Sequence, residues 1–187
     1  MESNWRSETF PAISARTTSR LIFGMLVVSN TSPLSNLAVV NRLDLLREQF
    51  GAVTIPPAVK AELERHPNPS ARGRALAAIL QKWACVRELS RPVPVELVLA
   101  LDTGGSEAIA LAMEIQADIV LLDESDARKK AKELGIRHTG VLGVLKKAKD
   151  AGRITSLRAE IHRLREEAGF FVYPTLEKEL LKSVNEA

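Results

Sequence analysis

Cysteine is almost absent from this chain of 187 residues, which contains only Cys85. A single cysteine excludes an internal disulfide bond and a zinc site with several cysteine ligands. Cys85 lies in the apolar stretch 83–86, where a thiol usually packs as a small hydrophobic side chain. We therefore predict a buried structural thiol at this position, in preference to a nucleophile.

Long apolar runs are also missing. No stretch approaches the roughly 20 residues that span a bilayer, and the charged, apolar and small-residue regions of a signal peptide are not found. These absences predict a cytoplasmic protein with no membrane partner.

Aromatic residues make up only 4% of the chain. The core is therefore expected to consist of Leu, Val, Ile and Ala, and few rings remain to stack on the bases of a single-stranded nucleic acid. The hydrophobic content of 45% and the length fit one domain with a sizeable core. The net charge of +3 permits an anionic partner without requiring one.

The motifs of common nucleotide-binding and hydrolytic enzymes are absent. The chain has no Walker A, HExxH or GxSxG motif, and the glycine pair 104–105 does not belong to a GxGxxG that follows a strand. The three histidines, His66, His138 and His162, are scattered along the sequence. A histidine acts as a base or a ligand beside a positioned partner, so we interpret all three as structural or solvated.

Short apolar segments alternate with helical patterns from residue 25 onward. Predicted strands lie at 27–28, 52–55, 84–89, 118–123 and 136–139, with helices in the intervals. The first helix is predicted to run from Pro33 to about Phe50, with Ser32 as its N-cap. This alternation indicates an α/β fold with three α/β/α layers, a mainly parallel central sheet and right-handed crossovers.

We divide the chain into three parts. Residues 1–24 are polar and lack clear periodicity, so we predict a flexible extension, which translation from Met25 would leave out. Residues 25–154 form the α/β domain. Residues 155–187 carry helices that are predicted to pack on this domain or on a partner. Their apolar stripe of Leu176, Leu180 and Leu181 also suits a homodimer.

Polar side chains gather where the predicted strands end. Asn30 and Asp123 directly follow strands. Glu107 lies in the first turn of the helix before the fourth strand, and Glu62 lies one turn into the helix after the second. Parallel strands place their carboxyl ends on one rim, where oxygen ligands suit Mg²⁺ or Mn²⁺. Ordinary structural roles are the alternative: a solvated helix edge for Glu62, a dipole-stabilising acid for Glu107 and a helix cap for Asp123.

Five segments follow one another in a recognisable order: Val28–Leu34, Ile55–Leu63, Leu101–Ala112, Leu121–Arg128 and Thr139–Leu145. Together they resemble the PIN domain, and specifically the prokaryotic family DUF3368, over about residues 27–154. The resemblance implies a doubly wound parallel sheet. It also implies an endoribonuclease that depends on Mg²⁺ or Mn²⁺ and commonly serves as the toxin of a type II toxin–antitoxin pair, with a small antitoxin as partner.

The resemblance also implies a set of site residues. The acidic quartet of PIN domains falls on Asn30, Glu62, Glu107 and Asp123. Of these, Glu62, Glu107 and Asp123 would hold the metal ion, with Asp126 or Glu124 as an additional outer acid. Thr31 matches the small hydroxyl residue that follows the first acid.

Two positions depart from the family pattern. PIN nucleases place an Asp where this chain has Asn30, and related chains often carry Glu where it has Gly105. An Asn side chain keeps one carbonyl oxygen, loses the charge and gains two hydrogen-bond donors. We therefore expect a weakened metal site.

Basic residues near the predicted rim are candidate RNA contacts. Together with Thr31 they are Arg65, Arg72, Arg128 and Lys129. Contacts of this kind give affinity for phosphate without sequence preference, and a solvated helix face is the ordinary alternative. Three functions stay open: an endoribonuclease with a weakened site, an inactive PIN-fold module that binds RNA or a protein, and a phosphate binder. The third lacks a visible phosphate-cradling loop.

Overall fold

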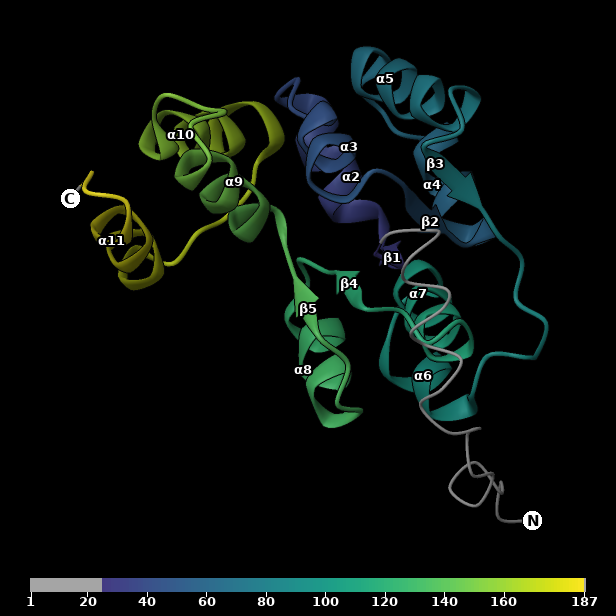
Figure 1. Cartoon of the computed structure of the whole chain (residues 1–187). Coiled ribbons are helices and arrows are strands. Elements are labelled where there is room, and N and C mark those ends of the chain that lie inside the picture. The colour runs from purple at the N-terminus through teal and green to yellow at the C-terminus, as the bar shows by residue number, and fades with distance from the viewer. Residues whose placement is uncertain (1–24, 187) are drawn as a thin grey trace.

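A five-stranded sheet forms the centre of the computed structural model, which describes residues 25–186. All four strand pairs are parallel, in the order β3–β2–β1–β4–β5. The strands are β1 (Val27–Ser29), β2 (Val53–Ile55), β3 (Ala84–Val86), β4 (Ile119–Leu121) and β5 (His138–Thr139). The predicted parallel α/β fold is confirmed (Figure 1). The predicted extension at residues 1–24 lies outside the described residues.

Helices cover both faces of the sheet, because successive side chains of a strand point to opposite sides. Val27 and Leu121 belong to one buried cluster, whereas Val28 and Val120 belong to the other. The first cluster takes apolar residues from α2 (Thr31–Val39), α3 (Asp44–Phe50), α4 (Pro57–Glu64), α5 (Pro69–Leu80), α9 (Val141–Asp150), α10 (Leu157–Ala168) and α11 (Pro174–Ser183). The second takes them from α6 (Val95–Ala100), α7 (Thr103–Glu114) and α8 (Ser125–Glu133).

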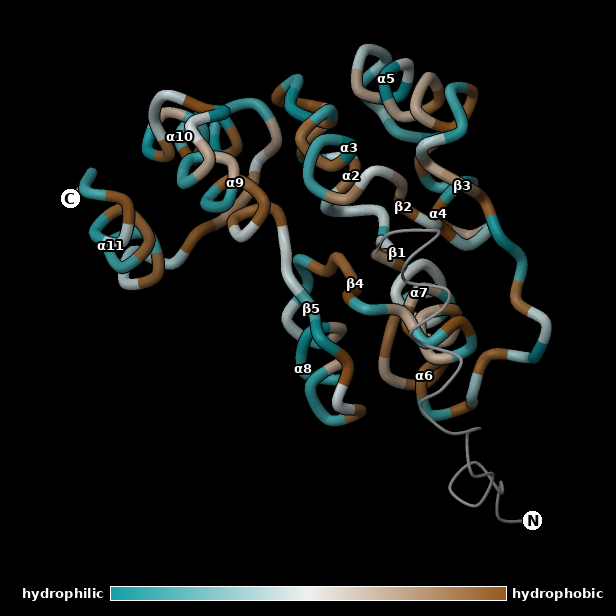
Figure 2. The backbone as a smooth tube through the Cα atoms, in the orientation of Figure 1, coloured by the Kyte–Doolittle hydropathy of each residue, from teal (hydrophilic) through white to brown (hydrophobic). Residues whose placement is uncertain are grey.

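Hydrophobic and hydrophilic residues alternate along the turns of the surrounding helices, as they do in amphipathic helices (Figure 2). The buried Ala, Val, Leu and Ile side chains of each helix belong to one of the two core clusters, although α7 is buried on most of its surface and α6 leaves Val95, Val98 and Leu99 exposed. Within residues 25–186 no helix is both long and apolar enough to cross a membrane.

The strand order reverses beside β1. From β1 the chain adds β2 and then β3 on one side, and it later returns to place β4 and β5 on the other. The connections that leave β1 and β4 therefore diverge, and in open parallel sheets the carboxyl ends of two such strands border a crevice. In open parallel sheets this switch point is where ligands bind.

The helix predicted for 33–50 is two helices. The chain leaves α2 at Val39, Asn41 adopts a positive φ of 55°, and α3 begins at Asp44. Arg74 of α5 donates to the terminal carbonyls of α2, with its Nε 2.6 Å from the Ala38 oxygen. The predicted N-cap, Ser32, was wrong, because α2 begins at Thr31 and its cap is Asn30.

The prediction of a buried Cys85 was also wrong. β3 is an edge strand, and only Ala84 of its three residues is buried. Cys85 is exposed, with its thiol donating to the Lys82 carbonyl at 3.3 Å. An apolar neighbourhood in sequence predicts burial only where both faces of a strand are covered.

Helix α10, the first of the two helices after residue 155, packs against α2 and α9 and is part of the first core cluster. Leu157, Ile161 and Leu164 are fully buried there. Glu160, only 5% exposed, accepts from the Arg42 guanidinium at 2.6 Å, and this contact raises the pKa of Arg42. A buried carboxylate is tolerable because it is paired.

Glu186 connects the end of the chain to the start of α10. Its carboxylate accepts from the backbone N–H groups of Leu157 and Arg158, at 2.9 and 2.8 Å, and from Lys149 Nζ at 2.7 Å. The first backbone N–H groups of a helix lack partners within the helix, so a carboxylate there is favourable. The bond from Lys149, followed by the backbone bonds, lowers the pKa of Glu186 to about 2.

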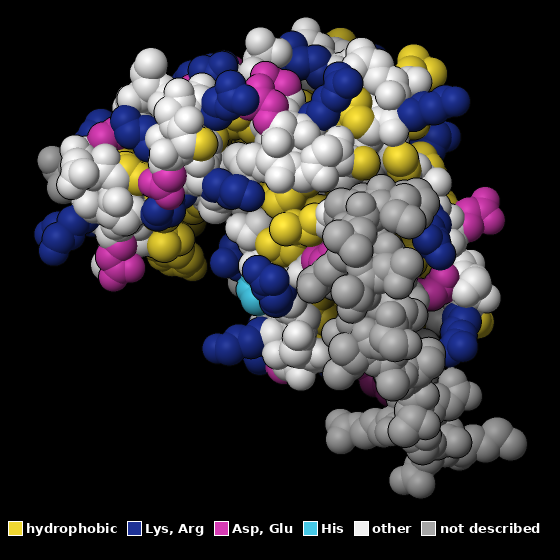
Figure 3. All heavy atoms as spheres, viewed as in Figure 1, with side chains coloured by type: hydrophobic (Ala, Val, Ile, Leu, Met, Phe, Trp, Pro, Cys, Tyr) yellow, Lys and Arg dark blue, Asp and Glu magenta, His cyan; other side chains and the backbone are white. Residues whose placement is uncertain are grey.

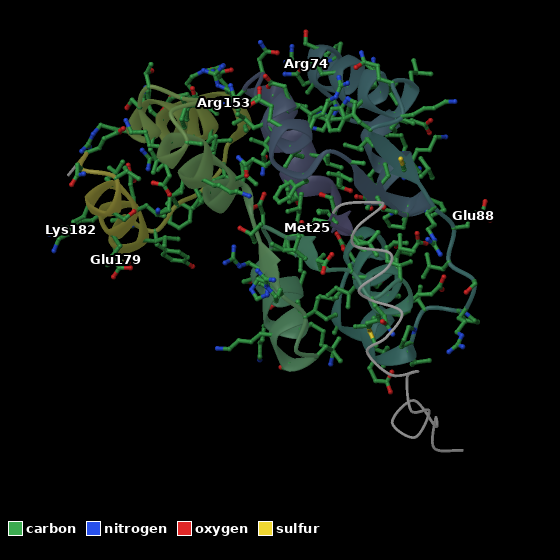
Figure 4. All side chains as sticks on the ribbon, viewed as in Figure 1. Met25, Arg74, Glu88, Arg153, Glu179 and Lys182 are labelled. Carbon is green, nitrogen blue, oxygen red and sulfur yellow. The ribbon has the colours of Figure 1, made fainter. Side chains whose placement is uncertain are left out.

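We predict that Glu186→Gln lowers the free energy of unfolding at neutral pH by roughly 0.5–1 kcal/mol, the usual scale of a helix cap. Because the folded pKa lies below the unfolded one, this stabilisation is present above pH 4.5 and disappears as the pH falls toward 2. Denaturant unfolding of wild type and variant between pH 2.5 and 7 measures the difference. Glu179→Gln is the control, because Glu179 is exposed on α11 (Figure 4). Equal effects of the two substitutions would contradict the prediction.

Candidate active site at the ends of strands β1 and β4

Asn30 lies at the switch point and is only 1% exposed. Its backbone N–H continues the parallel pairing by donating to the Leu121 carbonyl at 3.0 Å. Its side-chain Oδ1 accepts from the Thr31 N–H at 2.6 Å, and its Nδ2 donates to Glu124 Oε2 at 3.2 Å. Both ends of the amide are therefore used, and only this orientation satisfies both partners.

Glu62 of α4 and Asn30 converge on Gly104 in the first turn of α7. A Cβ atom at position 104 would lie 2.8 Å from Glu62 Oε1 and 2.9 Å from Asn30 Oδ1. The Thr31 hydroxyl also donates to the Glu62 carboxylate. The missing side chain at Gly104 is thus what leaves room for one carboxylate and one amide oxygen to meet.

Glu107 lies in the second turn of α7, because the helix begins at Thr103; the predicted first-turn position was wrong. Its Oε2 accepts from the backbone N–H of Ala58 at 3.0 Å. Ala58 is in the first turn of α4, where the backbone N–H groups have no partner inside the helix. Glu107 therefore holds the start of α4, the helix that carries Glu62, against α7.

Asp123 follows β4 and caps a helix, although not the next one in sequence. Its Oδ1 accepts from Val141 N, at the start of α9, at 2.7 Å, and its Oδ2 accepts from Asn36 Nδ2 at 3.2 Å. Burial raises the pKa of Asp123 to about 6. The two hydrogen bonds and the charge of Arg128 oppose this rise, whereas the charge of Glu124 adds to it.

Glu124 has a larger part in the site than its place as an optional outer acid predicted. It accepts from the Asn30 amide and from the Ser32 hydroxyl, so it joins the turn after β4 to the turn after β1. Asp126, the other outer acid, is exposed in the first turn of α8 and makes no hydrogen bond or ion pair with the described part of the chain. In the sequence, the only indication of this role was that Glu124 directly follows Asp123, the acid at the end of β4.

The predicted RNA contacts come from several elements and differ in exposure. Arg128 of α8 is exposed and interacts with Asp123, and Lys129 beside it is exposed. Arg65 is the C-cap of α4 and is exposed, whereas Arg72 is half-buried, with its Nη1 3.5 Å from the His66 carbonyl. Lys and Arg side chains on the visible face are spread among acidic ones and do not gather into one patch (Figure 3).

The donor set near the ends of β1 and β4 suits a hard metal ion by atom type but not by grouping. The side chains that meet at the crevice offer oxygen atoms, which suit Mg²⁺ or Mn²⁺ by type. Across residues 25–186, however, no group of three or more His, Cys, Asp or Glu side chains could hold a metal ion. The atom types are those that a hard cation prefers, but among the described residues the structure does not bring three such side chains together. The ligand set predicted from the sequence therefore stays a prediction.

The comparison with known families is decisive for the fold family. A family model, DUF3368, described as a PIN domain, matches residues 26–186. The chain belongs to this PIN-domain family. The match begins just before β1 and includes α10 and α11, so it extends beyond the 27–154 region of the resemblance in the sequence. PIN domains are generally nucleases or toxins of toxin–antitoxin pairs, and they typically use divalent metals.

Two solved structures are similar to this PIN domain. One is a PilT N-terminus domain protein from the hyperthermophilic archaeon Sulfolobus solfataricus, with 23% identity, a TM-score of 0.44, and coverage of 66% of this chain and 93% of that chain. The other is a domain of a functionally unknown protein from Methanocaldococcus jannaschii, with 21% identity, a TM-score of 0.41, and coverage of 62% and 90%. No curated protein matches the chain.

We predict that Asp123 in this PIN domain titrates near pH 6 in the absence of metal ions. Between about pH 4 and 6 the folded protein keeps a proton that the unfolded chain releases, so stability falls as the pH rises through this range. Arg128→Gln should raise the pKa of Asp123 further, and Glu124→Gln should lower it. Carboxyl ¹³C NMR titration in a chelating buffer measures these shifts. A value near 3.8 in the wild type would contradict the prediction.

Proposed function

We propose that this PIN domain is an endoribonuclease that depends on a divalent metal ion and has a weakened metal site. The observation that supports this proposal is the presence of acids around the carboxyl end of β1: Glu124 accepts from Asn30, Glu62 accepts from Thr31, and Asp123 follows the neighbouring strand β4. Carboxylates at such a strand end are placed to hold a cation beside a phosphodiester.

Glu62, Glu107 and Asp123 are the proposed ligands of Mg²⁺ or Mn²⁺, with Asp126 in an outer position. When bound, the cation would neutralise charge on the phosphodiester and lower the pKa of a water molecule. Asn30 would position a water molecule or the scissile phosphate with the amide N–H that does not donate to Glu124, and a carboxylate at this position has no such donor. Fewer negative charges in the crevice weaken its attraction for a divalent cation.

The proposed substrate is RNA, held through its phosphates by Thr31, Arg65, Arg72, Arg128 and Lys129. Such contacts predict affinity that falls as salt rises and little preference for sequence. If the protein is a toxin of a type II pair, its antitoxin would fill the acidic crevice with an Arg or Lys side chain. A homodimer and a cytoplasmic location complete the proposal.

A second candidate function is supported by Asn30 itself. Its amide occupies the position of a ligand carboxylate, and no three-acid metal cluster is found in residues 25–186. A PIN-fold module without catalysis, binding RNA or a protein, would have this arrangement. Calorimetric titration with Mn²⁺ distinguishes the two, because only the endoribonuclease requires binding.

We predict RNA cleavage by the wild type with Mn²⁺ or Mg²⁺, and a loss of about 100-fold or more in Asp123→Asn and Glu107→Gln. Asn30→Asp should raise the activity, because it restores a charged ligand. Single-turnover cleavage of a labelled RNA measures these rates. The same residual activity in wild type and both charge-removing variants would indicate a contaminating nuclease and refute the proposal.

Gly104→Ala provides a test that changes no charge. The added Cβ would displace the ends of the Glu62 and Asn30 side chains, so we predict at least about tenfold slower cleavage with the fold retained. Gly73→Ala is the matched control, because Gly73 is also within a helix and no atom lies within 4 Å of its added Cβ. This control should leave cleavage unchanged and raise stability by roughly 0.5–1 kcal/mol. Equal cleavage by both variants would remove Glu62 from the site.

A further inference from the structure

The four acidic side chains at the crevice are each held by donors of the protein itself. Thr31 donates to Glu62, and the Ala58 N–H donates to Glu107. The remaining donors are Val141 N and Asn36 for Asp123, and Ser32 and Asn30 for Glu124. A crevice of carboxylates ordinarily needs a cation or protons to offset their mutual repulsion. In this protein, hydrogen bonds donated by backbone N–H groups and neutral side chains offset much of that repulsion.

The bond from Asn30 to Glu124 joins two distant parts of the chain, as the bond from the Ser32 hydroxyl to the same carboxylate also does. The partners Asn30 and Glu124 are 94 residues apart, and they lie on the two turns that diverge at the switch point. On the sheet side of this bond, β1 and β4 are connected by backbone pairing, which ends with the Asn30 N–H. The side-chain bond is therefore the next connection outward, where the sheet has ended and the crevice begins.

A carboxylate at position 30 would turn the attraction between residues 30 and 124 into repulsion. The Asn30 Nδ2 atom is 3.2 Å from Glu124 Oε2, so an aspartate oxygen in its place would meet a second negative oxygen at that distance. Asn30 is almost fully buried whereas Glu124 is exposed, so water screens the pair from the Glu124 side only. Two carboxylates at this distance repel each other, and a proton or a cation between them relieves the repulsion.

We propose that Asn30 is a positioning residue that holds Glu124 across the switch point, so that the crevice between β1 and β4 is stable without a divalent cation. The amide supplies, through a hydrogen bond, the neutralisation that an aspartate at this position would need from a metal ion. This inference concerns the stability of the metal-free crevice and stands apart from the proposed RNA cleavage.

An exchange of the two side-chain types tests the proposal. Melting temperatures are measured for wild type, Asn30→Asp, Glu124→Gln and the double variant Asn30→Asp/Glu124→Gln, each in EDTA and in MnCl₂. In EDTA, Asn30→Asp should melt about 4–8 °C below wild type, the range expected for losing a charged hydrogen bond in a chain of this size. MnCl₂ should raise the melting temperature of Asn30→Asp by more than it raises that of wild type.

The double variant decides whether the pair itself is responsible. It places a carboxylate at position 30 and an amide at 124, so the hydrogen bond can form again with its polarity reversed. We expect it to recover at least half of the loss in EDTA. Asp126→Asn is the control for charge near the site, because Asp126 lies two residues further on and makes no contact with the pair. When Asp126→Asn is combined with Asn30→Asp, it should not restore any of the melting temperature lost in EDTA.

Three results would overturn the proposal: an unchanged melting temperature of Asn30→Asp in EDTA, a loss of equal size in EDTA and MnCl₂, or no recovery in the double variant. If Asn30→Asp does not fold in EDTA, folding of the double variant there supports the proposal and its failure to fold refutes it. No readout depends on RNA cleavage. An inactive protein would therefore refute the proposed function and leave this test unaffected.

Discussion

Parallel pairing between β1 and β4 is the interaction on which the site depends. It joins Val27–Ser29 to Ile119–Leu121, two short segments that are distant in sequence and buried on both faces. Three backbone-paired residues on each strand fix where the two carboxyl ends lie relative to each other. The polar residues that follow, Asn30 on one strand and Asp123 and Glu124 on the other, are thereby brought to one rim.

Negative charge at this rim is balanced mainly by the surrounding backbone and by neutral side chains. The starts of α4 and α9 provide N–H groups to Glu107 and Asp123, and α2 provides Asn36. Each of these bonds also attaches one helix to another element, so the same contacts that hold the acids hold the layers together. A site of this kind keeps its shape before any ligand binds, at the cost of having fewer free oxygen atoms to offer a cation.

Several features were predictable from the sequence because they depend on local pattern. Apolar segments between helical stretches predicted the parallel sheet, and the positions of Asn30 and Asp123 after strands were also predicted correctly. Features that depend on packing were not predictable. The helix expected at 33–50 is interrupted, where Arg74 from another helix binds the end of α2. Cys85 is exposed because β3 lies at the edge of the sheet, and strand order is not visible in a local sequence pattern.

The sequence by itself determined the fold class, the family and the presence of Asn30 where an acid is usual, because these follow from residue types and their spacing. Only the tertiary structure decided what each polar group does. It assigned Asp123 to α9 and not to the adjacent α8, and Glu107 to the start of α4. It also made Asn30 the partner of Glu124. Hydrogen bonds between residues so far apart in sequence exist only after the sheet has formed, because the sheet brings their partners within reach.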